Sequence, residues 1–193
     1  MIVTGTAKHF VKRAALVIGI LVALPASGAI GWAAYLRLSG NIHQIGTNEA
    51  FRSAQLSSSA FETVIEEHAI KTVINLRGSQ QNAAWYDSER ATTQRLSVIY
   101  IDLPLSANEE PDDAKLDLLI ATMRDAQKPL LIHCEGGADR SGLASALYRR
   151  FVEGTTYEKA AEELSFRYGH FPWLTSRTGA MDRAFARRAN NAP

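Results

Sequence analysis

The chain has 193 residues, 46% of them hydrophobic, which fits one globular domain. Its only cysteine, Cys134, excludes an intrachain disulfide and leaves too few thiolates for a Cys/His zinc site. The formal net charge is +1, but beyond Arg37 there are 17 basic and 20 acidic residues, a net charge of about −3. That balance excludes the basic footprint of a nucleic-acid-binding protein.

Residues 14–36 form an uncharged stretch of 23 positions that follows a basic segment, residues 1–13. As a helix this stretch is about 34 Å long, enough to cross a hydrocarbon core of about 30 Å. Trp32 and Tyr35 lie near its end, where aromatic rings favour the membrane interface. We therefore predict one transmembrane anchor. The preceding basic residues predict a cytoplasmic N-terminus, with the rest of the chain on the far, extracytoplasmic side of an inner or plasma membrane.

Two other interpretations of this stretch stay open. A cleaved signal sequence, with Ala26–Gly28 at the cleavage site, gives a secreted protein, although apolar residues continue to Leu36. A buried core helix is the second, and the length of the stretch argues against it.

Residues 37–50 are mostly polar and are predicted to link the anchor to a domain formed by residues 51–193. Within that domain, short apolar runs alternate with segments of helical periodicity. The predicted strands cover residues 72–76, 98–101 and 130–133, and the predicted helices cover about residues 57–68, 83–95, 111–123, 141–153, 156–168 and 177–189. This alternation predicts an α/β fold with a central, mostly parallel sheet flanked by helices.

The most informative segment follows the last predicted strand. Residues 133–142 read His-Cys-Glu-Gly-Gly-Ala-Asp-Arg-Ser-Gly, so that five residues separate Cys134 from Arg140, and a helical pattern follows. A loop of this kind points its backbone N–H groups inward at the positive end of a helix and forms a cradle for an anion. The helix dipole and Arg140 favour the thiolate form of Cys134, which is the nucleophilic form. The loop therefore predicts chemistry on a phosphoryl group.

The pattern His-Cys-x5-Arg-Ser resembles the signature loop of the cysteine-dependent protein tyrosine and dual-specificity phosphatases. The ending Gly-x-Asp-Arg-Ser-Gly resembles their atypical branch, which has bacterial, plant and fungal members. Three upstream segments resemble the same branch, namely residues 51–55, 70–77 and 105–111. The resemblance covers residues 51–168 and implies the fold of these enzymes, with neither a cofactor nor a metal.

The resemblance also implies roles for the residues of the loop. Cys134 attacks phosphorus and forms a cysteinyl-phosphate, and Arg140 holds two phosphate oxygens in a bidentate fork. Ser141 helps the sulfur to leave in the second step, and His133 stabilises the loop. The remaining phosphate-binding positions are Glu135, Gly136, Gly137 and Ala138.

The general acid is less clear, because residues 106–110 read Ser-Ala-Asn-Glu-Glu where the wider family has an aspartate. Asp139, beside Arg140, and Glu109 rank first for this role. The other carboxylates in reach are those of Asp102, Glu110, Asp112 and Asp113. We expect structural roles for Arg77, just beyond a strand, and for a turn at residues 170–173 beneath the cradle.

Several functions fit these features. The first is a phosphomonoester hydrolase of the tyrosine or dual-specificity type, with residues 14–36 in the membrane and a phosphoprotein as substrate. An extracytoplasmic domain would favour phosphorylated lipids, glycolipids or inositol phosphates instead. A phosphate-binding module without turnover is a further alternative, and a sulfur-transfer enzyme of the rhodanese type is the last.

Overall fold

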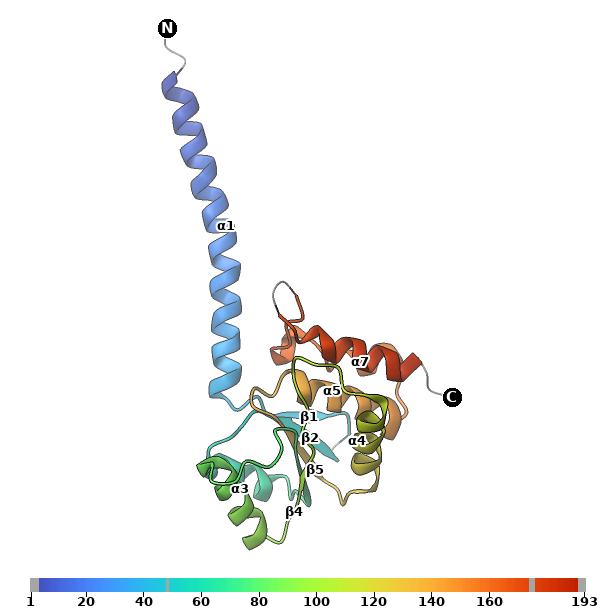
Figure 1. Cartoon of the computed structure of the whole chain (residues 1–193). Helices are drawn as coiled ribbons and strands as arrows, with labels where there is room; N and C mark the ends of the chain where they lie inside the picture. Colours follow the sequence, from blue (N-terminus) through green and yellow to red (C-terminus); the bar gives the residue numbers. More distant parts are fainter. Residues whose placement is uncertain (1–3, 48, 174–175, 191–193) are drawn as a thin grey trace. The chain divides into compact units, whose positions relative to one another are not determined.

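The protein is described here by a computed structural model of residues 4–47, 49–173 and 176–190 (Figure 1). It divides into two compact units, Met1–Leu36 and Arg37–Pro193. The strands are β1 (His43–Ile45), β2 (Ala50–Ser53), β3 (Thr72–Asn75), β4 (Ile99–Asp102) and β5 (Leu130–His133). The α-helices are α1 (Thr4–Leu38), α2 (Ser58–Glu67), α3 (Ala84–Arg95), α4 (Asp113–Asp125), α5 (Asp139–Leu147), α6 (Tyr157–Ala161) and α7 (Gly179–Asn190).

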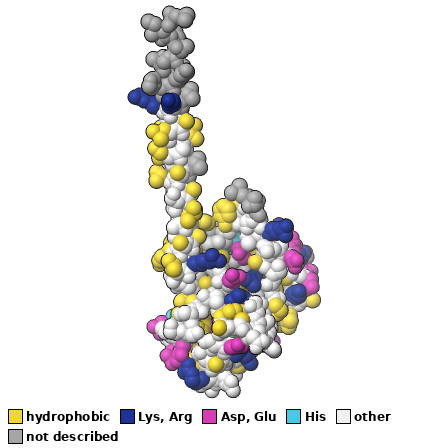
Figure 2. Space-filling model, turned by 60° about the vertical axis from the view of Figure 1, so that its left-hand side comes forward, with side chains coloured by type: hydrophobic (Ala, Val, Ile, Leu, Met, Phe, Trp, Pro, Cys, Tyr) yellow, Lys and Arg dark blue, Asp and Glu magenta, His cyan; other side chains and the backbone are white. Residues whose placement is uncertain are grey.

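Helix α1 is the long apolar helix that the sequence predicts. Within it, Ala15–Leu38 is long and apolar enough to cross a membrane, a test that a signal sequence near an N-terminus also passes. Figure 2 shows hydrophobic side chains along this helix, and those of Leu16, Leu21 and Leu24 are about two-thirds exposed.

The second unit is built on a five-stranded sheet in the order β1-β2-β5-β3-β4. All neighbouring pairs are parallel except β1 and β2, so the predicted mostly parallel sheet is confirmed. In the register of the central strand, His133 of β5 lies opposite Ser53 of β2 and Asn75 of β3. Three strands therefore end at one level, and the chain leaves the middle one at Cys134.

Both faces of the sheet are covered, as expected for parallel strands. Figure 1 shows α3 on one side of the sheet and α4, α5 and α7 on the other. Alternate residues of β5 enter different cores: Leu131 packs with Phe61 of α2, whereas Leu130 and Ile132 pack with residues of α4, α5 and α7. All four β5 residues are buried, which holds the strand end rigidly beneath the loop.

The prediction that residues 37–50 link the anchor to the domain is wrong. Arg37 onward belongs to the second unit, and residues 43–45 form the edge strand β1. Ile45 is fully buried and Asn41 is 1% exposed. The segment looks like a linker because it is short, polar and rich in turn residues, but its few apolar and amide groups have partners elsewhere in the fold.

Two predicted helices also differ from the structure. The helix predicted at 156–168 is interrupted: it consists of the short helix α6 and, after a break, a 3-10 helix at Phe166–Tyr168. The 3-10 helix ends at Gly169, which has the left-handed conformation. The one at 141–153 begins earlier, at Asp139, and its last turn is a π-helix, Tyr148–Val152. Tertiary packing overrides local helical pattern at such ends.

Candidate active site

The loop after β5 holds its carbonyl groups outward. The amide N–H of Gln55 donates to the carbonyl of Glu135 at 3.1 Å, and Asn41 Nδ2 donates to that of Gly136 at 3.1 Å. The carbonyls of Gly137 and Ala138 both accept from Arg52, at 3.0 and 2.9 Å. Four consecutive carbonyls are thus bound from outside the loop.

The N–H groups of residues 135–138, by contrast, have no hydrogen-bond partner within the described parts of the chain. Buried or half-buried backbone donors are seldom left unpaired, so a row of them points to a ligand that accepts hydrogen bonds. Cys134 lies at the base of this loop, 2% exposed, with its Sγ 3.5 Å from Ser141 Oγ. These free amides and the buried sulfur are compatible with the anion cradle that the sequence predicts.

Arg52 is the main support of the cradle. Its side chain is fully buried, and Nη1 donates to the carbonyl of Glu163 at 2.8 Å and to the carboxylate of that residue at 3.1 Å. The guanidinium also lies 4.3 Å from the ring of Tyr168. A buried charge is tolerated only when it is paired and hydrogen-bonded in this way. The sequence places Arg52 in a segment of the resemblance but gives no sign of this role.

Arg140 lies where the loops after β3 and β4 meet the cradle. Its Nη1 is 3.4 Å from the carbonyls of Leu76 and Leu105, and its Nη2 is 4.0 Å from the Glu135 carboxylate. The buried Nε of Arg140 has no partner in the described structure. A guanidinium with spare donors beside a row of free amides suits a phosphate oxygen.

His133 lies at the end of β5, 1% exposed, on the side of the sheet covered by α2 and α3. Its Nε2 is 3.4 Å from the carboxylate of Glu89, without hydrogen-bond geometry. Burial raises the pKa of Glu89, but contacts with His133, Tyr100 and Gln55 outweigh burial and hold the pKa below its usual value. His133 thus lies between the end of β5 and Glu89 of α3.

The carboxylates considered for the general acid differ in their hydrogen-bond and ion-pair partners. Asp102 accepts hydrogen bonds from Asn75 and Tyr86, and Asp112 caps α4. The two remaining competitors in the loop and helix start pair with α7: Glu110 bonds Arg183 and Arg187, and Asp113 bonds Arg187. The two carboxylates that rank first by sequence, those of Asp139 and Glu109, have different surroundings again.

Glu109 is exposed, and no partner of its carboxylate is found among the described residues. It lies on the loop that begins at Leu105, whose carbonyl is next to Arg140, and it lines a small pocket with Ser106 and Lys115. The structure does not bring Glu109 into contact with Cys134, so its access to a leaving group depends on a bound substrate.

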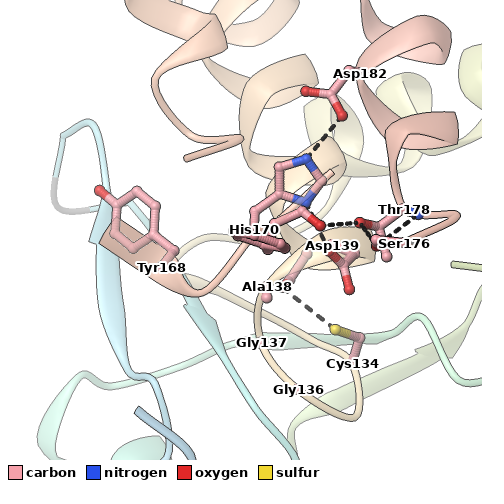
Figure 3. Close-up of polar contacts among 12 residues, drawn as sticks. Cys134, Gly136, Gly137, Ala138, Asp139, Tyr168, His170, Ser176, Thr178 and Asp182 are labelled. Carbon is pink, nitrogen blue, oxygen red and sulfur yellow. Dashed lines mark hydrogen bonds and ion pairs between the residues drawn. The ribbon is translucent and has the colours of Figure 1, made fainter. Parts of the chain in front are cut away.

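Asp139 has a partner that the sequence does not reveal. Figure 3 shows the imidazole of His170 between two carboxylates: Nδ1 lies 2.7 Å from Asp139 Oδ1 and Nε2 lies 2.8 Å from Asp182 Oδ2. His170 is fully buried. Burial alone lowers the pKa of His170, but the hydrogen bonds to Asp139 and Asp182 outweigh it and raise the pKa to about 9. The turn predicted at residues 170–173 therefore contributes His170 to a charged cluster with Asp139 and Asp182.

Two further expectations concern Arg77 and metals. Arg77 stacks on Trp85, 4.0 Å from the ring centroid, and donates to Gln55 at 2.8 Å, which is the structural role expected for it. Across residues 4–47, 49–173 and 176–190, no group of three or more His, Cys, Asp or Glu side chains is arranged to hold a metal ion.

The fold and the loop together are those of the cysteine-dependent phosphatases of the tyrosine and dual-specificity class. More specifically, the chain belongs to the family described as DSP-PTPase phosphatase fused to NAD+ kinase, whose sequence model matches residues 36–181.

The chain is similar to the dual specificity protein phosphatase TpbA of Pseudomonas aeruginosa strain UCBPP-PA14, with 29% identity over 135 residues. The match covers 69% of this chain and 57% of that protein, so the chain spans little more than half the length of this curated relative.

Solved structures share the fold. A TpbA variant from P. aeruginosa in complex with pTyr has a TM-score of 0.58 and 23% identity, covering 79% of this chain and 93% of that one. The core catalytic domain of the PP-IP phosphatase SIW14 from S. cerevisiae has a TM-score of 0.59 and 15% identity, covering 74% and 83% of the two chains. At these identities the likeness establishes the fold alone.

From the geometry of the loop, we predict that alanine substitution destabilises the fold at Gly137 but not at Gly136. Gly137 has a φ of +67°, and a Cβ there would lie 2.6 Å from the backbone nitrogen of Ala54. We expect Gly137→Ala to lower the free energy of unfolding by about 3 kcal/mol. Gly136 has open space at this position, and Gly136→Ala is the matched control, with a change within about 0.5 kcal/mol. Urea unfolding followed by tryptophan fluorescence measures both, and equal losses would contradict the geometry.

The His170 cluster predicts a pH-dependent contribution to stability. A pKa raised from 6.5 to about 9 stabilises the fold fully below pH 6.5, and the contribution is lost as pH rises through 9. At about 1.4 kcal/mol per pH unit, its upper limit is roughly 3 kcal/mol. We expect the stability gap between the wild type and His170→Asn to shrink by up to this amount between pH 6 and pH 9.5 in urea unfolding. A constant gap would show that the imidazole is neutral.

Proposed function

We propose that the protein hydrolyses phosphomonoesters, with the Cys134 thiolate as nucleophile and a cysteinyl-phosphate as intermediate. The observation that carries this proposal is the row of free amides at residues 135–138 in the loop that follows a buried sulfur, with the carbonyls of the same four residues all bound from outside. Such preorganised donors stabilise the charge on a transferring phosphoryl group without reorganisation during the reaction.

In the first step, the sulfur of Cys134 attacks phosphorus, the P–O bond to the alcohol or phenol breaks, and the leaving oxygen needs a proton. Glu109 is our assignment for this proton donor, because it is exposed, unpaired and on a loop that reaches Arg140. Asp139 is less suited to it, since its carboxylate already faces a buried histidine that holds a proton.

In the second step, water attacks the cysteinyl-phosphate, the S–P bond breaks and inorganic phosphate leaves. Arg140 binds two equatorial oxygens through both steps, which the planar guanidinium does better than an ammonium. Ser141, whose Oγ lies 3.5 Å from the sulfur, donates a hydrogen bond to the departing thiolate.

For the substrate, we propose a phosphorylated tyrosine, serine or threonine side chain, by analogy with the relative named as a dual specificity protein phosphatase and its pTyr complex. Phosphorylated lipids, glycolipids or inositol phosphates are the second candidate class. The apolar helix Ala15–Leu38 favours them, because it would hold the domain beside a lipid surface.

We propose that this helix is a single-pass anchor with its basic N-terminal flank in the cytoplasm and the phosphatase domain on the far side of the membrane. Secretion after cleavage of a signal sequence is the alternative. The mass of the mature protein, measured in membrane and soluble fractions, separates the two.

Turnover of p-nitrophenyl phosphate by the full chain in detergent tests the proposed chemistry. We expect Cys134→Ser to abolish turnover and Arg140→Lys to lower kcat/KM by a factor of about 100 or more. Arg188→Lys is the matched control, since Arg188 pairs with Asp117 away from the loop. Phosphate binding without turnover in the wild type would instead identify a phosphate-binding module, and turnover of thiosulfate would identify sulfur transfer.

The proton donor is tested by leaving-group dependence. Because a phenol leaves with little help and an alcohol does not, we expect Glu109→Gln to slow alkyl phosphates at least tenfold more than aryl phosphates. Glu110→Gln is the matched control, because the neighbouring carboxylate is paired with Arg183 and Arg187. Equal slowing of both substrate types by Glu109→Gln would remove this residue from the role.

A further inference from the structure

The cluster of Asp139, His170 and Asp182 has a defined protonation pattern. An ionised carboxylate only accepts hydrogen bonds, so a histidine with a carboxylate on each ring nitrogen must carry a proton on both. The distances of 2.7 and 2.8 Å are those of charge-assisted hydrogen bonds. With His170 fully buried, this imidazolium is shielded from solvent. The cluster therefore holds one positive charge between two negative ones.

This arrangement fixes the ionisation of Asp139. Its Oδ1 accepts from the imidazolium, and it is the first residue of α5, where the helix dipole also favours an anion. The Asp139 side chain is 26% exposed, and no described residue is within hydrogen-bond distance of its second oxygen. That oxygen is thus an acceptor open to water, one residue before Arg140. In Figure 3, the Asp139 carboxylate lies on the side of His170 that faces Cys134.

We propose that Asp139 is the general base for hydrolysis of the cysteinyl-phosphate, and that His170 and Asp182 are positioning residues that hold it ionised and oriented. This inference rests on the proposed phosphatase activity, and it assigns the two proton transfers of that reaction to two different carboxylates. Glu109 donates a proton in the first step, and Asp139 accepts one in the second.

The step balances as follows. The oxygen of a water molecule forms a bond to phosphorus while the S–P bond breaks, and the electron pair of that bond returns to Cys134 as a thiolate. One water proton moves to the free oxygen of Asp139, and the product is inorganic phosphate. Asp139 then releases the proton to solvent, while His170 keeps both of its own protons throughout.

Asp182 completes the geometry from α7. Without it, the Nε2 proton of His170 would be buried with no acceptor, so the ring would be free to lose that proton or rotate away from Asp139. An orienting carboxylate behind a histidine is a known way of fixing the ring for its partner on the other side. The exposed position of Asp182, 41% accessible, makes it the variant least harmful to folding.

The test separates the two chemical steps. The full chain is mixed with ³²P-labelled aryl phosphate, quenched rapidly in acid, and the fraction of protein carrying ³²P is measured with kcat. For Asp139→Asn we expect kcat to fall by about a hundredfold, the phosphorylated fraction to rise toward one, and the rate of its formation to stay within twofold of the wild type. Asp182→Asn should shift the same quantities in the same direction, but less.

A merely structural role for the cluster would lower the rate of phosphorylation together with kcat and would not trap the intermediate, and that result would overturn the inference. A steeper dependence on the leaving group in Asp139→Asn would also overturn it, because it would make Asp139 the acid. Asp117→Asn is the matched control, since it removes another carboxylate that pairs with α7 and should change none of the three quantities. Absence of aryl phosphate turnover in the wild type, together with absence of a ³²P-protein that depends on Cys134 in Asp139→Asn, would instead reject the proposed function.

Discussion

The site depends on hydrogen bonds that bind the loop carbonyls from behind. A peptide unit that directs its C=O to a partner on one side presents its N–H on the other, and the three units between residues 135 and 138 do so here. The partners come from the segment before β1, from β2 and from the residue two positions after β2. Because these donors belong to the rigid sheet and its flanks, the amides are oriented before any anion arrives. Binding then requires little reorganisation, which is the condition for strong electrostatic stabilisation.

The two arginines of the site divide structural and chemical work between them. Arg52 has its guanidinium enclosed by Glu163, two loop carbonyls and the ring of Tyr168, so it is committed to structure. Within the described residues, Arg140 makes long contacts with two carbonyls and the Glu135 carboxylate and leaves Nε without a partner, so it retains donors for a ligand. Removing the buried arginine would leave Glu163 uncompensated in the interior, the costliest way of disturbing an ion pair.

The features that could be predicted from the sequence are those formed by residues close together in the chain. The glycines, Cys134 and Arg140 lie within one short loop, and the strand before it is a continuous apolar run, so both the cradle and the parallel sheet follow from neighbouring residues. The roles of Arg52, Asn41 and His170 could not be predicted, because their partners in and around the loop lie 12 to 127 positions away in the chain. No pattern in the sequence pairs residues over such distances. The same reason explains the missed strand β1: its polar residues resemble a linker until Ile45 is seen in the core.

The solitary thiol has a consequence for redox damage. A sulfur with the role proposed for Cys134 is also one that peroxides attack readily, giving a sulfenic acid. Many sensitive cysteines are rescued by a second, resolving thiol that captures this species as a disulfide. Cys134 has no such companion in this chain. Its protection from overoxidation must therefore come from burial at the base of the loop, from the adjacent backbone nitrogen, or from a small thiol of the surroundings.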